Sequence, residues 1–252
     1  MIMIKTSREL EWMKQAGRIA ARALKCGGEA VEPGVSTFEI DRLIRKTIEE
    51  AGATPSFLGY SGYPASACIS VNSEVIHGIP NRQRKIQEGD IVSIDVGAYF
   101  EGFHGDNAAT FACGDISPQA RDLIDVTRES LNKGIRAAVI GGRIGDIGNA
   151  IQRYVESRGY SVVRDFVGHG VGAKLHENPS VPNFGTPGRG VRLLKDMTIA
   201  IEPMINVGDW KVKILDDGWT TITADGSLSA HFEHSLAITD DGPMILTLPD
   251  DC

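Results

Sequence analysis

The sequence predicts an α+β fold, and three observations support that prediction. Two amphipathic helical segments precede the first strands of the chain, and a second pair of helical segments follows residue 117. A long β-hairpin lies between the two pairs, from Ile91 to Phe111. Helices grouped before strands are typical of α+β proteins, whereas doubly wound sheets alternate helices with strands.

Length and composition describe an ordinary globular chain. Its 252 residues suit one large domain or two small ones, and 42% of them are hydrophobic. The net charge of −7 argues against binding nucleic acid or anionic membranes through bulk charge. We expect no signal peptide and no membrane helix, because no apolar run approaches about 20 residues. The cysteines show no CxxC spacing, which favours reduced thiols in a cytosol; they are Cys26, Cys68, Cys113 and Cys252.

The first elements follow from capping residues and periodicity. Apolar residues recur at helical spacing from Thr6 to Val31, with Thr6 or Ser7 as the N-cap. Ser36 or Thr37 caps a second helix that ends before Gly52. A loop rich in glycine and proline then leads to a short strand, Ala67–Val71.

The hairpin carries two aspartates. Glu101-Gly102 supplies the turn chemistry between its strands. An even-length loop would place Asp95 and Asp106 on one face, opposite or diagonal to each other, whereas an odd loop or a bulge would separate them. Facing carboxylates repel each other, so a bound divalent cation is one interpretation. A solvated polar face is the alternative.

A shift of 107 residues aligns the second half of the chain with the first. It places Gly34 on Gly141 and Gly52 on Gly159, and it predicts a helix over Ser117–Val139. Such helical matches also arise by chance, but the shift sets Asp95 on Glu202, at the end of a matching strand. We therefore expect one domain, residues 1–252, with a pseudo-repeat of about 6–111 and 117–240.

Three further acidic or imidazole side chains occupy unusual settings. His169 lies between glycines, Glu202 ends an apolar strand, and Glu233 interrupts a strand-like run from Ala230 to Ile238. A buried carboxylate is costly unless it is paired or bound to a metal. Alone, His169 would be interpreted as a satisfied core or surface histidine, and each of the three residues could belong to a structural ion pair.

Together these residues resemble one family. The order Asp95, Asp106, His169, Glu202 and Glu233, within the words SIDVG, GFHGD, GHGVG, IEPM and HFEH, resembles the metal ligands of the methionine aminopeptidases. The resemblance extends from Ile4 to Leu248. It implies the pita-bread fold of the creatinase/aminopeptidase family, with two pseudo-symmetric helix–helix–strand halves around a curved, mainly antiparallel sheet. The short spacings favour the type I class, without an N-terminal zinc-binding extension.

The resemblance also implies a dinuclear metal centre. Asp106 and Glu233 would bridge two divalent ions, Asp95 would chelate one, and His169 and Glu202 would complete the other. Glu202 would also act as general base toward a bridging water. Four carboxylates carry four negative charges, which two divalent cations balance. Mainly oxygen ligands with one nitrogen suit Mn, Fe(II), Co or Zn.

Substrate-binding residues are likewise implied by the resemblance. His77 would contact the scissile amide, and His176 would bind the substrate carbonyl and the tetrahedral intermediate. Without the resemblance, both would be interpreted as surface histidines. The implied methionine pocket comprises Tyr60, Tyr63, Cys68 and Trp219, with Phe57 and Leu175 at its edge; the alternative is six ordinary core residues. Asn72, Glu74 and Ser229 match loops that hold a monovalent cation in some relatives.

The resulting expectation is a cytoplasmic, metal-dependent exopeptidase. It would remove the initiator methionine from nascent polypeptides when the second residue is small, and it would retain its own Met1 because Ile2 is bulky. We expect a monomer that encounters the ribosome and binds no membrane or other nucleic acid. The rivals are an X–Pro aminopeptidase or dipeptidase on the same fold and a non-catalytic peptide-binding relative.

Overall fold

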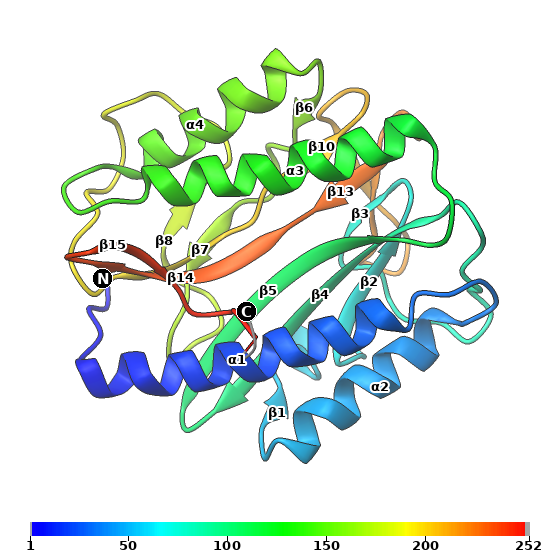
Figure 1. The fold of residues 1–252 in the computed structure, drawn as a ribbon, viewed down its shortest axis with the longest axis horizontal. Coiled ribbons are helices and arrows are strands. Elements are labelled where there is room, and N and C mark those ends of the chain that lie inside the picture. Colours follow the sequence, from blue (N-terminus) through cyan, green and yellow to red (C-terminus); the bar gives the residue numbers. More distant parts are fainter. Residues whose placement is uncertain (1, 250–252) are drawn as a thin grey trace.

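A computed structural model describes residues 2–249, so Met1 and Cys252 lie outside the described residues. Two helix pairs flank a curved sheet: α1 and α2 lie along the bottom of Figure 1, and α3 and α4 along the top. The helices are α1 (Ser7–Glu29), α2 (Thr37–Glu50), α3 (Pro118–Ala137) and α4 (Ile144–Ser157), and a 3₁₀ turn covers Tyr60–Gly62. Within residues 2–249, none of these helices is both long and apolar enough to cross a membrane.

The described part of the chain contains fifteen strands, and the largest sheet contains nine of them. Every strand pair in this sheet is antiparallel, as expected. The strands are β1 (Thr54–Pro55), β2 (Ala67–Val71), β3 (Glu74–Ile76), β4 (Ile91–Phe100), β5 (Phe103–Ala112), β6 (Ser161–Val162), β7 (Gly168–Gly170), β8 (Glu177–Val181), β9 (Thr198–Ile201), β10 (Met204–Asn206), β11 (Val212–Ile214), β12 (Thr221–Thr223), β13 (Ser229–His231), β14 (Glu233–Thr239) and β15 (Gly242–Ile245).

The helix starts agree with the capping residues in the sequence. The Thr6 hydroxyl accepts the Glu9 N–H, and the Glu9 carboxylate accepts the Thr6 N–H, which completes a capping box. Ser36 and Glu39 form the same box at α2. Helices α1 and α3 each end two residues before the predicted Val31 and Val139. Adding 107 to the bounds of α2 gives the bounds of α4, while the division of the chain into domains stays a prediction.

The order of the central sheet joins the two halves of the chain. It runs β1-β4-β5-β14-β9-β7-β8, with β2 beside β4 and β15 beside β14. Strand β14 therefore connects the first-half hairpin with strands from the second half. The predicted run from Ala230 to Ile238 is wrong in one respect: it breaks at Phe232 into β13 and β14. The break lets β13 pair with β10 while β14 enters the central sheet.

Helix α1 crosses directly over β4 and β5 (Figure 1). At one close approach a glycine of β5 meets a glycine of α1, since a Cβ on Gly105 would lie 2.4 Å from the backbone nitrogen of Gly17. Any larger residue at Gly105 would push α1 away from the strand that carries Asp106. Fully buried isoleucines fill the space beneath the helices, each contributing about 1.5–3 kcal/mol of burial free energy; they include Ile40, Ile44, Ile69, Ile94, Ile147 and Ile151.

The hairpin β4–β5 has the register that the sequence predicts. Glu101 and Gly102 form its two-residue turn, and both have positive φ, at 50° and 88°. Two positive φ values are those of a type I′ turn, whose twist matches that of the flanking strands. Asp95 pairs with Ala108, and Asp106 pairs with Gly97. The two aspartates are therefore diagonal neighbours on one face, and that prediction is confirmed.

Candidate metal centre and substrate cavity

Five candidate ligands arise from five neighbouring strands. Strands β4, β5, β14, β9 and β7 follow one another across the sheet. Ala108 on β5 lies opposite both Asp95 on β4 and Glu233 on β14, so these carboxylates share the face of Asp106. Register alone therefore brings three carboxylates together. The remaining candidates come from the next two strands: Glu202 directly follows β9, and His169 lies in β7.

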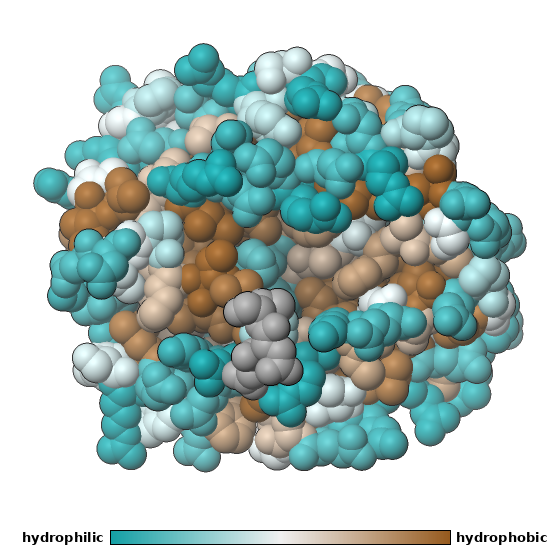
Figure 2. Space-filling view, viewed as in Figure 1, coloured by the Kyte–Doolittle hydropathy of each residue, from teal (hydrophilic) through white to brown (hydrophobic). Residues whose placement is uncertain are grey.

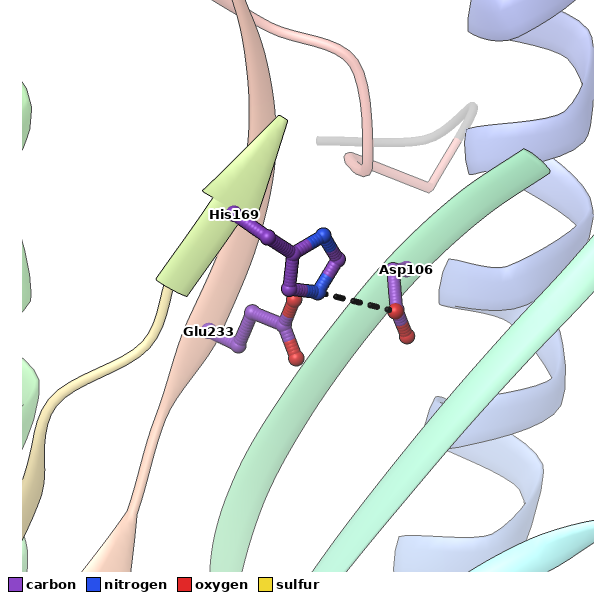
Figure 3. Close-up of side chains that lie close together, drawn as sticks. All are labelled: Asp106, His169 and Glu233. Carbon is purple, nitrogen blue, oxygen red and sulfur yellow. Dashed lines mark ion pairs between the residues drawn. The ribbon is translucent and has the colours of Figure 1, made fainter. Parts of the chain in front are cut away.

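The imidazole of His169 faces these carboxylates. Figure 3 shows the His169 ring directed between Asp106 and Glu233, and one ligand atom from each residue lies within 4.8 Å of the others. His169 Nε2 is 3.8 Å from Asp106 Oδ2 and 3.5 Å from Glu202 Oε1. These separations are too long for hydrogen bonds, yet they are short enough to surround a cation.

The protonation of His169 suits a metal ligand. Its Nδ1 lies 2.8 Å from the carbonyl oxygen of Gly170, and because a carbonyl only accepts, Nδ1 carries the proton. The lone pair is consequently on Nε2, which faces the carboxylates. Burial lowers the pKa of His169 to about 3, so the ring is neutral at neutral pH. A backbone carbonyl that fixes the tautomer in this way is common beside metal-binding histidines.

Three of the four carboxylates have an oxygen that is left without a partner in the protein. Burial and the neighbouring acids raise the pKa values of Asp95, Glu202 and Glu233 well above their usual range, and burial raises that of Asp106 to about 7. Buried oxygens of Asp95, Asp106 and Glu233 have no hydrogen-bond partner. Unpaired buried oxygens around a neutral imidazole are the donor set that a divalent transition metal requires, so the residues fit such an ion.

A cavity of about 180 Å³ opens onto this cluster. The structure brings every predicted site residue to its wall. Three further lining residues, Ile76, Phe166 and Val167, were missed by sequence reasoning, because isolated apolar residues carry no chemical signal. The predicted residues on the wall are Phe57, Tyr60, Tyr63, Cys68, His77, Asp95, Asp106, His169, Leu175, His176, Glu202, Trp219 and Glu233.

Two further histidines border the cavity. His176 Nδ1 lies 2.7 Å from the Tyr60 hydroxyl, and the His176 ring centroid is 4.2 Å from that of His169. The hydroxyl can donate to Nδ1 or accept from it, and in the first case the ring proton of His176 is on Nε2. His77 has a positive φ of 59°, a strained conformation for a non-glycine residue, and its ring packs edge-on against Phe166 and Trp219. Burial lowers the pKa of His77 to about 4, which keeps it neutral.

The remaining wall is apolar. Phe57, Tyr63, Cys68 and Leu175 form one buried cluster, against which Trp219 packs. The Tyr63 hydroxyl donates to the carbonyl of Gly78 at 2.9 Å, which satisfies the polar end of this buried ring. Burial raises the pKa of Cys68, so its sulfur is a protonated thiol. The six predicted pocket residues are therefore contiguous with the carboxylates.

One neighbour of the cluster was not predicted. His231 Nε2 lies 3.9 Å from Glu202 Oε2, and burial lowers the pKa of His231 to about 3. A signal was present in the word HFEH, because residues 231 and 233 share a face of any extended segment.

Residues 11–240 match the model of metallopeptidase family M24. The chain belongs to this family, and within it to the methionine aminopeptidases. It is 54% identical to the methionine aminopeptidase of Clostridium acetobutylicum, over 98% of the chain and 99% of that protein. It is 50% identical to methionine aminopeptidase 1 of Bacillus subtilis, over 98% and 99%. The fold resembles the crystal structure of methionine aminopeptidase from Thermotoga maritima, with a TM-score of 0.97, 48% identity and coverage of 98% and 99%.

More distant M24 folds share the architecture alone. The prolidase from Pyrococcus furiosus superimposes with a TM-score of 0.79 at 24% identity, and the chain covers 66% of it. The predicted pita-bread α+β fold is confirmed. Family membership and the Asp106–His169–Glu233 cluster together identify an enzyme that uses divalent metal.

Proposed function

We propose that the cavity hydrolyses the first peptide bond of new polypeptides, releasing the initiator methionine when the second residue is small. The observation that carries the proposal is that two different surfaces line one cavity of about 180 Å³. One surface is apolar and suits an unbranched thioether, and the other is the carboxylate–imidazole cluster. Relatives that are 50–54% identical over 98% of the chain are named methionine aminopeptidases and support the same activity.

Two divalent ions fit the charge of the cluster. Asp106 and Glu233 would bridge the ions, Asp95 would chelate one, and His169 and Glu202 would complete the other. Bound ions supply Lewis acidity and lower the pKa of a coordinated water. Oxygen-rich ligands with one imidazole suit Mn, Fe(II), Co or Zn.

The protein side chains would then divide the remaining chemistry. Glu202, at the junction of cluster and cavity, would accept a proton as general base. His176 would donate from Nε2–H to the carbonyl oxygen as charge develops there, with the Tyr60 hydroxyl donating to its Nδ1. Neutral His77 would contact the scissile amide from the side of Phe166 and Trp219.

The apolar wall would select methionine. Aromatic rings contact thioether sulfur favourably, by about 0.3–1.5 kcal/mol for each contact. Tyr63 and Trp219 meet edge to face with ring centroids 5.0 Å apart, which gives the pocket a rigid aromatic side. Phe57 and Leu175 would close its edge, beside Cys68 and Tyr60.

The proposed setting is the cytoplasm, where the enzyme would meet nascent N-termini at the ribosome as a monomer. Free thiols at Cys26, Cys68 and Cys113 support a reducing compartment. A monovalent cation would stabilise the chain segments around Asn72, Glu74 and Ser229. In support, the Ser229 N–H donates to the Asn72 carbonyl, so these segments adjoin.

Peptide hydrolysis tests the function directly. Chelated protein is assayed on Met-Gly-Met, Met-Pro-Ala and Lys-Pro-Ala, before and after addition of Mn(II), Co(II) or Fe(II). Release of methionine but not lysine, only with metal, is the expected result. Equal cleavage of Lys-Pro-Ala would support an X–Pro enzyme instead.

The Glu202→Ala variant distinguishes the enzyme from a peptide-binding protein. Hydrolysis requires the carboxylate, so turnover of Met-Gly-Met should be nearly abolished. A protein that only binds peptides would lack turnover as wild type and would keep its peptide affinity in the variant.

A further inference from the structure

His231 lies directly behind Glu202, outside the cavity wall. It is the last residue of β13, it is 2% exposed, and it pairs with Met204 on β10, two residues beyond Glu202. Its backbone is held from both sides by Thr110 on β5: the His231 N–H donates to Thr110 Oγ1, and the Thr110 hydroxyl donates to the His231 carbonyl, both at 2.9 Å. The position of the ring is therefore set by the central sheet.

The ring nitrogen of His231 has no partner. Among residues 2–249, seven buried side-chain atoms lack a hydrogen-bond partner; six are oxygens, and the seventh is His231 Nε2. Its nearest ion-pair partner is Glu202 Oε2 at 3.9 Å, while the other oxygen of Glu202 is 3.5 Å from His169 Nε2. The Glu202 carboxylate thus lies between two imidazoles. Leaving a buried donor unpaired is unfavourable, and a small rotation of Glu202 would bring its free oxygen within hydrogen-bond distance.

We propose that His231 is the positioning residue of Glu202, donating from Nε2–H to Oε2 and thereby holding Oε1 toward the metal cluster. This inference rests on the proposed function, because it gives Glu202 its role there. The backbone of Glu202 is already fixed, since Asn183 Nδ2 donates to its carbonyl at 3.0 Å. A donor on the second carboxylate oxygen would fix the side chain as well. A hydrogen bond to a metal ligand from a residue that does not bind the metal orients the ligand and tunes its basicity.

Two substitutions separate the donor from the volume of the ring. His231→Leu fills the site but removes the N–H, whereas His231→Gln retains an amide N–H of similar reach. His234→Leu is the control, because His234 is a half-buried histidine with one ring hydrogen bond, 2.9 Å from Nδ1 to Thr247 Oγ1. Its neighbour Glu233 faces the cluster, so His234 points to the opposite side of β14.

Calorimetric titration with Mn(II) gives the first result. Loss of an outer-shell partner weakens metal binding or activity by about 10–100-fold, which is the loss expected for His231→Leu. His231→Gln and His234→Leu should bind Mn(II) within about threefold of wild type. For Met-Gly-Met, kcat should fall in His231→Leu while KM changes little, because Glu202 acts on the reaction and not on the methionine side chain. Equal losses in His231→Leu and His234→Leu, or none in either, would overturn the inference.

The tautomer of His231 gives an answer that needs no activity. In ¹⁵N spectra of the zinc-loaded protein, a proton on Nε2 is expected, with its resonance shifted in Glu202→Gln. A proton on Nδ1 instead, or no response to Glu202→Gln, would contradict the inference even if His231→Leu failed to fold. The wild-type protein could hydrolyse no peptide and still show this tautomer, while His231→Leu binds Mn(II) more weakly. That result would refute the proposed function and leave the positioning of Glu202 by His231 intact.

Discussion

The two sides of the cavity are built differently. One side, the strand floor, consists of Asp95, Asp106 and Glu233 on three adjacent strands, and the hydrogen-bond register fixes their spacing. The other side, the loop rim, consists of Tyr60, His176 and Trp219, which lie between strands. Tyr60 is 40% exposed, whereas Asp106 and Glu233 are 4% and 2% exposed. In the proposed function, metal binding would thus depend on the sheet, and substrate selection would depend on segments that can vary without disturbing it.

The largest effect is expected from a substitution that changes only the strand floor. Asp106→Asn removes the charge of a carboxylate that is proposed to bind both ions. Mn(II) affinity and kcat should therefore each fall by more than about 100-fold, which is the upper limit when only a hydrogen-bond partner of a ligand is lost. The metal-free protein should nevertheless gain stability, because one buried, unpaired acid becomes neutral. Calorimetry and thermal melts of the chelated protein measure both changes. Asp41→Asn, a buried acid outside the cavity, is the control and should bind metal normally; unchanged Mn(II) binding in Asp106→Asn would contradict the proposed ligand set.

Breaking the rim should give the opposite pattern. His176→Ala would remove the proposed donor to the developing oxyanion, so kcat should fall by about 10²–10³-fold. Metal affinity should stay within about twofold of wild type, because the ring of His176 faces His169 without holding a carboxylate. Steady-state kinetics and Mn(II) titration separate the two effects. A large loss of Mn(II) affinity would show that rim and floor are one unit.

The pH dependence of stability should differ between the metal-free and the metal-bound protein. The folded-state pKa of Asp106 is raised to about 7, so between pH 4 and 7 the folded state binds more protons than the unfolded state. Relative to Asp106→Asn, the stability of the chelated protein should therefore fall as pH rises through that range; the comparison cancels the buried histidines, whose lowered pKa values act in the opposite direction. Bound Mn(II) favours the ionised carboxylates and should reverse the slope. Thermal melts at pH 5 and 7.5, with EDTA or Mn(II), measure both slopes; parallel slopes would contradict a metal centre at the floor.

The floor was more predictable from sequence than its surroundings. The Glu101-Gly102 turn fixes an even loop, and an even loop fixes the diagonal of Asp95 and Asp106, so local rules sufficed there. The insertion of β14 between β5 and β9 is a non-local pairing of a late strand, and no periodicity in the sequence indicates it. The unpaired Nε2 of His231 is likewise a tertiary property. Resemblance placed the rim residues on the cavity wall, while their roles stay proposals.

The smallest expected effect concerns the support beneath the rim. Asp41 on α2 is buried, and its Oδ1 accepts the backbone N–H groups of Ser66 and Ala67 at 2.8 and 2.9 Å. These bonds anchor the segment between Tyr63 and Cys68. Removing the acceptor in Asp41→Ala leaves two buried donors unpaired and should cost about 1–3 kcal/mol of unfolding free energy.

Asp41→Asn keeps an oxygen at the same place, so it should stay near the wild-type stability. Because the anchored segment carries pocket residues and no metal ligand, KM for Met-Gly-Met should rise in Asp41→Ala while Mn(II) affinity holds. Denaturant unfolding and peptide kinetics check the two results together. If Asp41→Ala weakened Mn(II) binding as much as it raised KM, the strand floor would depend on the loop rim, and the separation between the two sides of the cavity would fail.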